Sequence, residues 1–132
     1  MLRPILTLTA LAMLALTGCQ QTAQSTTRPS RAPAARVVGE AVNCIPLTQI
    51  RTSRVHDDFT IDFEMGGRKL YRNTLPNSCP GLGFEASFTN ETSLSQLCSV
   101  DIIYVLRHTG AMLQRGAGCG LGKFVPIELD RK

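Results

Sequence analysis

The densest group of polar side chains in this 132-residue sequence is His56-Asp57-Asp58. An imidazole and two carboxylates could supply general acid–base chemistry, and Asp101 could complete a hydrolase site. Adjacent residues of an extended chain do not face one another, however. We therefore expect solvated side chains at a turn or strand entrance, and rank the hydrolase hypothesis lowest. His108 ends an apolar segment, where a surface position is expected.

Glycine spacing provides a second candidate, the segment Gly116-Ala-Gly-Cys-Gly-Leu-Gly122. A phosphate-binding loop needs a helix N-terminus after the glycines, because aligned N–H groups hold the phosphate. Here the glycines lead into Phe124-Val125-Pro126, which is no helix. The sequence instead predicts a tight turn around Cys119. No G-x-S-x-G nucleophile elbow occurs, and Asn90-Glu91-Thr92 is interpreted as a chance glycosylation sequon.

The N-terminus has the pattern of an export signal. Arg3 is followed by an uncharged apolar run from Ile5 to Leu16, which is shorter than the ~20 residues of a membrane-spanning helix. Small residues and then polar, low-complexity sequence come next. The order Leu16-Thr17-Gly18-Cys19 resembles the lipobox of bacterial lipoproteins, in which the cysteine is lipidated after residues 1–18 are removed.

The lipobox resemblance implies that the membrane is reached through lipid on Cys19. A multiply acylated N-terminus is in effect permanently anchored, since one chain alone binds marginally. An aspartate after the cysteine is the usual inner-membrane retention signal of such lipoproteins. Gln20 stands there instead. We therefore expect an outer-membrane lipoprotein that faces the periplasm; an ordinary secretory signal is the alternative.

Residues 19–36 are expected to form the lipidated cysteine and a disordered tether, because they offer little to bury. Of the 14 basic residues, Arg3 leaves with the signal and Arg28, Arg31 and Arg36 lie in this tether. The remaining 10 balance the 10 acidic residues, so the globular part is formally neutral and a nucleic-acid partner is not expected. The tether arginines could meet anionic lipid or cell-wall carboxylates, but a solvated spacer is the simpler expectation.

Four cysteines remain once Cys19 is assigned to lipid, and an even number in an oxidising compartment predicts two disulfides. No C-x-x-C motif or neighbouring histidine supports a metal site, and no cofactor is expected. Three pairings are possible. We favour Cys79–Cys98, which closes the loop-rich middle, and Cys44–Cys119, which joins the beginning of the fold to its end.

Residues 37–132 predict one small all-β domain, a barrel or sandwich of about five to six strands. Apolar and polar residues alternate from Phe59 to Met65, the pattern of a strand with one buried face. Gly66-Gly67 then marks a hairpin. A two-residue loop would set Glu64 opposite Lys69; we prefer a three-residue loop that sets Phe63 beside Tyr71, because aromatic burial outweighs one exposed ion pair.

The rest of this domain is read more coarsely. Residues 84–88 predict a short strand, residues 93–96 a brief helical turn, and residues 100–106 a central strand covered on both faces. Pro126 cannot donate to a ladder, so the last strand is expected at a sheet edge.

The four cysteines with their neighbours, NCIPLTQI, TLPNSCPGLGF, LCSVDII and GCGLGKFVPI, resemble an uncharacterised family of small exported bacterial proteins, classed as a domain of unknown function. The resemblance implies a non-cytoplasmic, disulfide-bearing domain and assigns no catalytic residue. The leading hypothesis is a non-enzymatic module that binds an envelope protein or peptidoglycan. The alternative is an inhibitor of a cell-wall hydrolase, similar to lysozyme-inhibitor lipoproteins, that inserts the 116–122 loop into the enzyme.

Overall fold

The computed structural model describes residues 29–131, which form an all-β domain with two disulfides and one short helix. The strands make three antiparallel sheets, and many of them are only three residues long. No helix in residues 29–131 is long and apolar enough to cross a membrane. The predicted lipobox and Cys19 lie outside the described residues.

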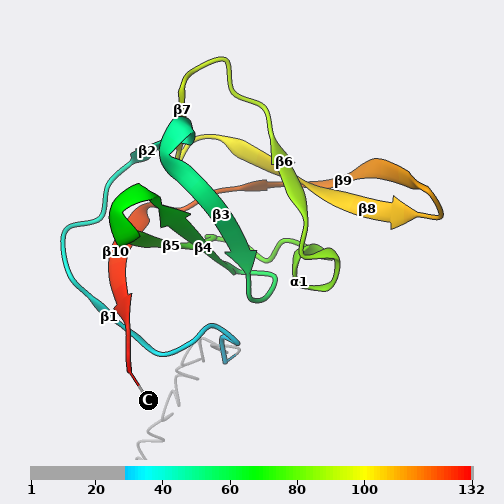
Figure 1. Cartoon of the computed structure of the whole chain (residues 1–132). Coiled ribbons are helices and arrows are strands. Elements are labelled where there is room, and N and C mark those ends of the chain that lie inside the picture. The colour runs from blue at the N-terminus through cyan, green and yellow to red at the C-terminus, as the bar shows by residue number, and fades with distance from the viewer. Residues whose placement is uncertain (1–28, 132) are drawn as a thin grey trace, which may run out of the picture.

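Five strands form the largest sheet, in the order β1-β10-β5-β4-β3 (Figure 1). Their bounds are β1 Ala35–Val37, β3 Ile50–Val55, β4 Thr60–Met65, β5 Leu70–Thr74 and β10 Phe124–Leu129.

The β4–β5 hairpin confirms the predicted three-residue loop. Phe63 pairs with Tyr71, and the Met65 N–H donates to the Lys69 carbonyl across the turn η2, Gly66–Arg68. Gly67 and Arg68 both have positive φ, of 75° and 64°. The second value is uncommon for a residue with a Cβ.

Strand β4 departs from the predicted alternation, because both of its faces are buried. Ile61, Phe63 and Met65 face the core as expected. Thr60 and Asp62, expected in solvent, are 3% exposed. The segment before β1 lies against this second face, where Ser30 contacts Thr60 and Arg72 donates to the Pro33 carbonyl.

Three strands form the second sheet, in the order β6-β8-β9, with bounds β6 Phe88–Asn90, β8 Ile102–Thr109 and β9 Met112–Gly120. Strand β8 is central, as predicted for residues 100–106, but only its Ile103 and Val105 face is buried. Ile102 is 42% exposed. The prediction of coverage on both faces was therefore wrong.

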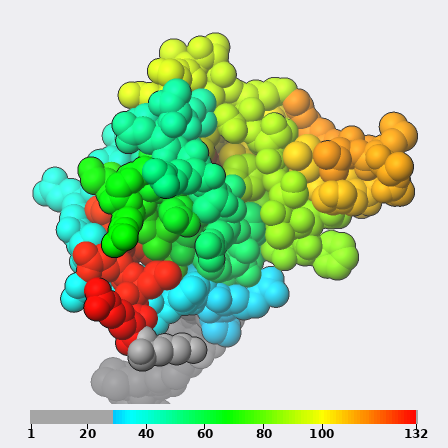
Figure 2. All heavy atoms as spheres, viewed as in Figure 1, coloured from blue at the N-terminus to red at the C-terminus, as the bar shows by residue number. Residues whose placement is uncertain are grey.

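The hydrophobic core lies between these two sheets. Phe63 of β4 makes edge-to-face contacts with Phe88 of β6, at a centroid distance of 6.2 Å, and with Phe124 of β10, at 5.5 Å. Burial of apolar area at ~25 cal/mol per Å² is the main stabilising contribution of such a core. The distal half of the β8–β9 hairpin projects beyond the core, as Figure 2 shows in orange.

The disulfides correct the predicted pairing, for they join Cys44 to Cys98 and Cys79 to Cys119. Strands β2 (Cys44–Pro46) and β7 (Gln96–Cys98) form a two-stranded sheet in which Cys44 lies directly opposite Cys98. Cys79 is fully buried in the loop after β5 and reaches Cys119 of β9, with a Cα–Cα distance of 5.7 Å. The second bridge therefore links the two larger sheets.

Three further expectations are corrected by the backbone. Residues 82–85 form the helix α1 (Leu82–Glu85), so the predicted strand begins only at Phe88, and Phe84 is 89% exposed. Residues 93–96 contain no helical turn and lead into β7. A short 3-10 turn, η1 (Leu47–Gln49), instead joins β2 to β3.

Strand β10 is not the edge strand expected from Pro126, because β1 pairs along its outer side. The Val38 N–H donates to the Pro126 carbonyl, so the Pro126 nitrogen faces the same side. This position lies just past the end of β1 at Val37. Pro126, which has no N–H to donate, therefore stands where the pairing between β1 and β10 ends.

Candidate functional site

Residues 29–34, predicted as part of a free tether, are held against the five-stranded sheet. Asp57 is 8% exposed and receives the Ser30 hydroxyl and the Arg31 N–H, both at 2.9 Å, on Oδ2. Its Oδ1 receives the Phe59 N–H at 2.9 Å. The domain therefore begins before residue 37. Within the predicted tether, Arg36 also pairs with Glu128 at the surface.

These contacts determine the acidity of Asp57. Burial alone raises the pKa of its carboxyl group, but hydrogen bonds from the Phe59 and Arg31 amides and from the Ser30 and Thr60 hydroxyls outweigh burial. The pKa is therefore lowered, and Asp57 is a carboxylate at neutral pH. Both oxygens of the Asp57 carboxylate therefore accept hydrogen bonds that hold the fold together.

Asp62, on β4, forms a second buried cluster. Its two carboxylate oxygens receive Arg72 Nε and Nη2 at 2.7 and 2.8 Å, and His56 Nε2 lies 2.9 Å from Oδ2. Arg72 Nη1 also donates to the Pro33 carbonyl at 3.0 Å. Hydrogen bonds to Asp62 raise the pKa of Arg72. The cluster thus joins β4, β5, the loop after β3 and the N-terminal segment.

Asp58 points in a third direction. Its Oδ1 accepts the Gly83 N–H at 2.8 Å, and its carbonyl accepts the Cys79 N–H at 2.8 Å. His56, Asp57 and Asp58 therefore bind three separate partners, as expected of adjacent residues. The expectation that they are solvated was wrong for Asp57, and the His56 side chain is only 16% exposed.

The remaining candidates of the hydrolase hypothesis lie elsewhere. Asp101 accepts the Cys98 N–H at 2.6 Å in the turn between β7 and β8. His108 is at the surface as predicted, 3.2 Å from Glu85, and its side-chain hydrogen bond is the main cause of a lowered Glu85 pKa. Among residues 29–131, no three His, Cys, Asp or Glu side chains are close enough to hold a metal ion.

The glycine-rich segment is a strand and not the predicted turn. Residues 116–120 belong to β9, and Cys119 pairs with Ile103 of β8. A Cβ at Gly118 would lie 2.9 Å from the Tyr104 ring, so glycine lets that ring cross the strand. The loop on which the inhibitor hypothesis depended is therefore not present.

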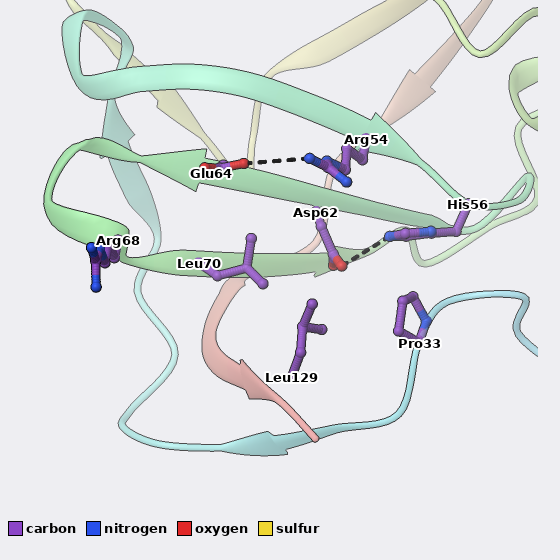
Figure 3. Close-up of a pocket in the computed structure, with 8 residues that line it drawn as sticks. All are labelled: Pro33, Arg54, His56, Asp62, Glu64, Arg68, Leu70 and Leu129. Carbon is purple, nitrogen blue, oxygen red and sulfur yellow. Dashed lines mark hydrogen bonds and ion pairs between the residues drawn. The ribbon is translucent and has the colours of Figure 1, made fainter. Parts of the chain in front are cut away.

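A groove of about 320 Å³ lies beside the Asp62 cluster, on the face of the sheet away from the core (Figure 3). It is lined by both charged and apolar side chains, which are Pro33, Arg54, His56, Asp62, Glu64, Arg68, Leu70 and Leu129. The lining brings together the N-terminal segment, β3, β4, the β4–β5 turn, β5 and β10.

Charge is unevenly distributed in this groove. Asp62 is neutralised by Arg72, whereas Arg54 and Glu64 are 3.8 Å apart, with Arg54 largely exposed and Glu64 half exposed. Arg68 projects from the turn at one end, and Leu70 and Leu129 supply apolar surface (Figure 3). The groove can therefore hold a partner that offers apolar groups together with charges of both signs.

Sequence reasoning did not identify this groove. One signal was available, because the preferred hairpin register places Asp62 directly opposite Arg72. This register predicts an ion pair between Asp62 and Arg72, although it does not by itself show that the face is covered. Comparisons with family models, curated proteins and solved structures found no match to this chain. The resemblance based on the cysteine pattern stays a prediction.

Proposed function

We propose that this chain is a lipid-anchored, non-enzymatic binding module of the bacterial cell envelope that faces the periplasm. The observation that carries the proposal is the order Leu16-Thr17-Gly18-Cys19 after a short apolar run, with Gln20 favouring the outer membrane. Two disulfides support an oxidising compartment, because they persist poorly in the cytosol.

The position of the anchor relative to the groove supports a binding role near the membrane. Cys19 precedes Ser30 by eleven residues, which span at most ~40 Å. Ser30 is already bonded to Asp57, and Pro33 lines the groove. A groove tethered this closely would meet envelope components at the membrane surface.

The chemistry of the groove favours a peptide-bearing partner. Arg54, Glu64 and Arg68 offer exposed charges of both signs beside Leu70 and Leu129. Peptide segments of envelope proteins, or the peptides of peptidoglycan, present the same combination of charged and apolar groups. The buried carboxylates Asp57 and Asp62 are already saturated by hydrogen bonds, which favours a holding role over a catalytic one.

Anchoring is tested by feeding cells a clickable fatty acid. We expect the label on the wild-type chain in the membrane fraction and none on the Cys19→Ala variant, which should leave that fraction. A wild-type chain without label, found among cytosolic proteins, would refute the proposal.

The groove is tested with two neighbouring substitutions. Arg68→Asn removes a groove cation and suits the positive φ at this position. Lys69→Asn is the matched control, because Lys69 is exposed in the same hairpin but does not line the groove. After cross-linking in intact envelopes, Arg68→Asn should lower recovery of the bound component several-fold and Lys69→Asn should not. Equal recovery from both variants would exclude the groove as the site.

A further inference from the structure

The two larger sheets end in four outer strands, and these differ in how their edges are protected. Strands β1 and β6 are only three residues long, and β3 carries Arg51 and Arg54 with a register irregularity. Short strands and charged side chains are ordinary ways to prevent edge-to-edge pairing. Strand β9 is nine residues long with Arg115 as its sole charge. It is the longest outer strand in the described part of the chain, although it carries one bulge, as β3 does.

The direction of the backbone groups in this sheet follows from one hydrogen bond. The Leu106 N–H donates to the Ser87 carbonyl at 2.9 Å, so the backbone N–H and C=O groups of Leu106 in β8 point toward β6. Alternate residues of an antiparallel strand point to opposite sides. Ile103, Arg107 and Thr109 therefore point toward β9 and are hydrogen-bonded to it.

The same alternation identifies the β9 residues that point outward. The partners of those β8 residues are Cys119, Gln114 and Met112, whose backbone N–H and C=O groups point back to β8. Gly116 and Ala117 form a bulge that interrupts this alternation, and the alternation resumes at Gly118. The residues that point outward are Leu113, Arg115, Gly118 and Gly120. No strand, loop or side chain within residues 29–131 hydrogen-bonds to their backbone groups.

These four outward positions are symmetric about the bond between Gly116 and Ala117. If a second β9 pairs antiparallel about a two-fold axis at this bond, every outward residue meets another outward residue. Leu113 then lies opposite Gly120, and Arg115 opposite Gly118, so each large side chain faces a glycine. Arg115 does not face its own copy directly, which avoids the repulsion of like charges across a strand pair.

Gly120 supports this arrangement independently. Its φ is not positive, and a Cβ there would meet nothing closer than Ile102 Cδ1 at 4.0 Å. Nothing within residues 29–131 requires glycine at this position, unlike at Gly118. A two-fold strand pair would use Gly120 to accommodate Leu113 of the second copy.

We propose that two copies of this chain associate through antiparallel pairing of their β9 edges, which would join the two three-stranded sheets into one. A closed two-fold pair satisfies the outward N–H and C=O groups of both copies and leaves no further β9 edge for a third copy.

The pairing is tested in cells that make the full-length chain, with a photo-cross-linking amino acid at position 113. Illumination should give a species of about twice the chain mass. Tryptic peptides should then join residue 113 to residues 116–123 of another copy. The same amino acid at Thr52, on the protected β3 edge, should give no dimer. Absence of the species at position 113, or cross-linking to a different polypeptide there, would overturn the proposal.

Two substitutions at Leu113 separate backbone pairing from side-chain contact. Leu113→Pro removes an outward N–H without removing a bond to β8, whereas Leu113→Thr keeps the N–H and removes the apolar side chain. For chains extracted in detergent, light scattering should give a dimer dissociation constant ~10- to 100-fold weaker for the proline variant. The threonine variant should change it by no more than about threefold.

Both variants should keep their two disulfides and their unfolding midpoint, which shows that the monomer is intact. A proline variant that dimerises like wild type would overturn the proposal, as would an equal loss in both variants.

Discussion

The two larger sheets use the same antiparallel pairing but treat their outer surfaces in opposite ways. In the five-stranded sheet, residues 30–33 contact Asp57 and Arg72, and both Asp57 and Asp62 are buried. In the three-stranded sheet no segment of residues 29–131 covers the distal hairpin, and Met112 and Leu113 are 66% and 58% exposed. The comparison shows that polar residues are buried and hydrogen-bonded where another segment covers them, while apolar residues stay exposed where none does.

The Cys79–Cys119 bridge ties the two sheets together, and its removal should have the largest effect on this comparison. Replacing both cysteines with alanine opens a loop of 40 residues and should lower the free energy of unfolding by ~4 kcal/mol. Urea unfolding of the oxidised proteins measures this change. Peptide mapping without reductant should first recover Cys79 joined to Cys119 and Cys44 joined to Cys98; any other pairing would contradict the fold described above.

Asp62→Asn should have the next largest effect, because it leaves Arg72 beneath the N-terminal segment without its carboxylate. Loss of one partner from a buried ion pair typically costs ~3 kcal/mol. Glu64→Gln is the control on the same strand, since Glu64 is half exposed and its pair with Arg54 should contribute less than ~1 kcal/mol. Equal destabilisation by the two variants, measured by urea unfolding, would show that cover by the N-terminal segment adds nothing to the contribution of Asp62.

Asp57 makes the covered face sensitive to acid. Its pKa in the folded chain lies below its unfolded value, so its carboxylate stabilises the fold fully above about pH 4 and progressively less as the pH falls toward the folded pKa. Asp57→Asn should therefore lower stability at pH 7 by ~1 kcal/mol and flatten the decline below pH 4. Thermal unfolding from pH 2 to 7 measures both. An unchanged slope would mean that Asp57 is not the acid-sensitive group.

Gly120→Ala should have the smallest effect on the monomer, and of opposite sign. Alanine fits the free space at this position and reduces the entropy of the unfolded chain, so the monomer should gain ~0.5 kcal/mol. Gly118→Ala should instead destabilise, because its Cβ meets the Tyr104 ring. Chemical unfolding at concentrations low enough to exclude association distinguishes the two.

The local parts of this fold were predictable from sequence, and the non-local parts were not. Alternation from Phe59 to Met65 predicted the core face of β4, because side chains alternate with period two. The preference for burying Phe63 beside Tyr71 predicted the register of β4 with β5. The cysteine pairing depended on β2 meeting β7 across 54 residues, which no local pattern records. The burial of Asp57 and Asp62 depended on residues 29–34, whose composition resembles that of a free linker.

The contacts of the N-terminal segment follow one another along the chain, from Ser30 with Asp57 through Pro33 with Arg72 to β1 with β10. A mechanical pull on the N-terminus would therefore reach the Ser30 contact first and the β1–β10 pairing last. The bridges Cys44–Cys98 and Cys79–Cys119 lie beyond β1 and would keep the rest of the domain closed under such a pull.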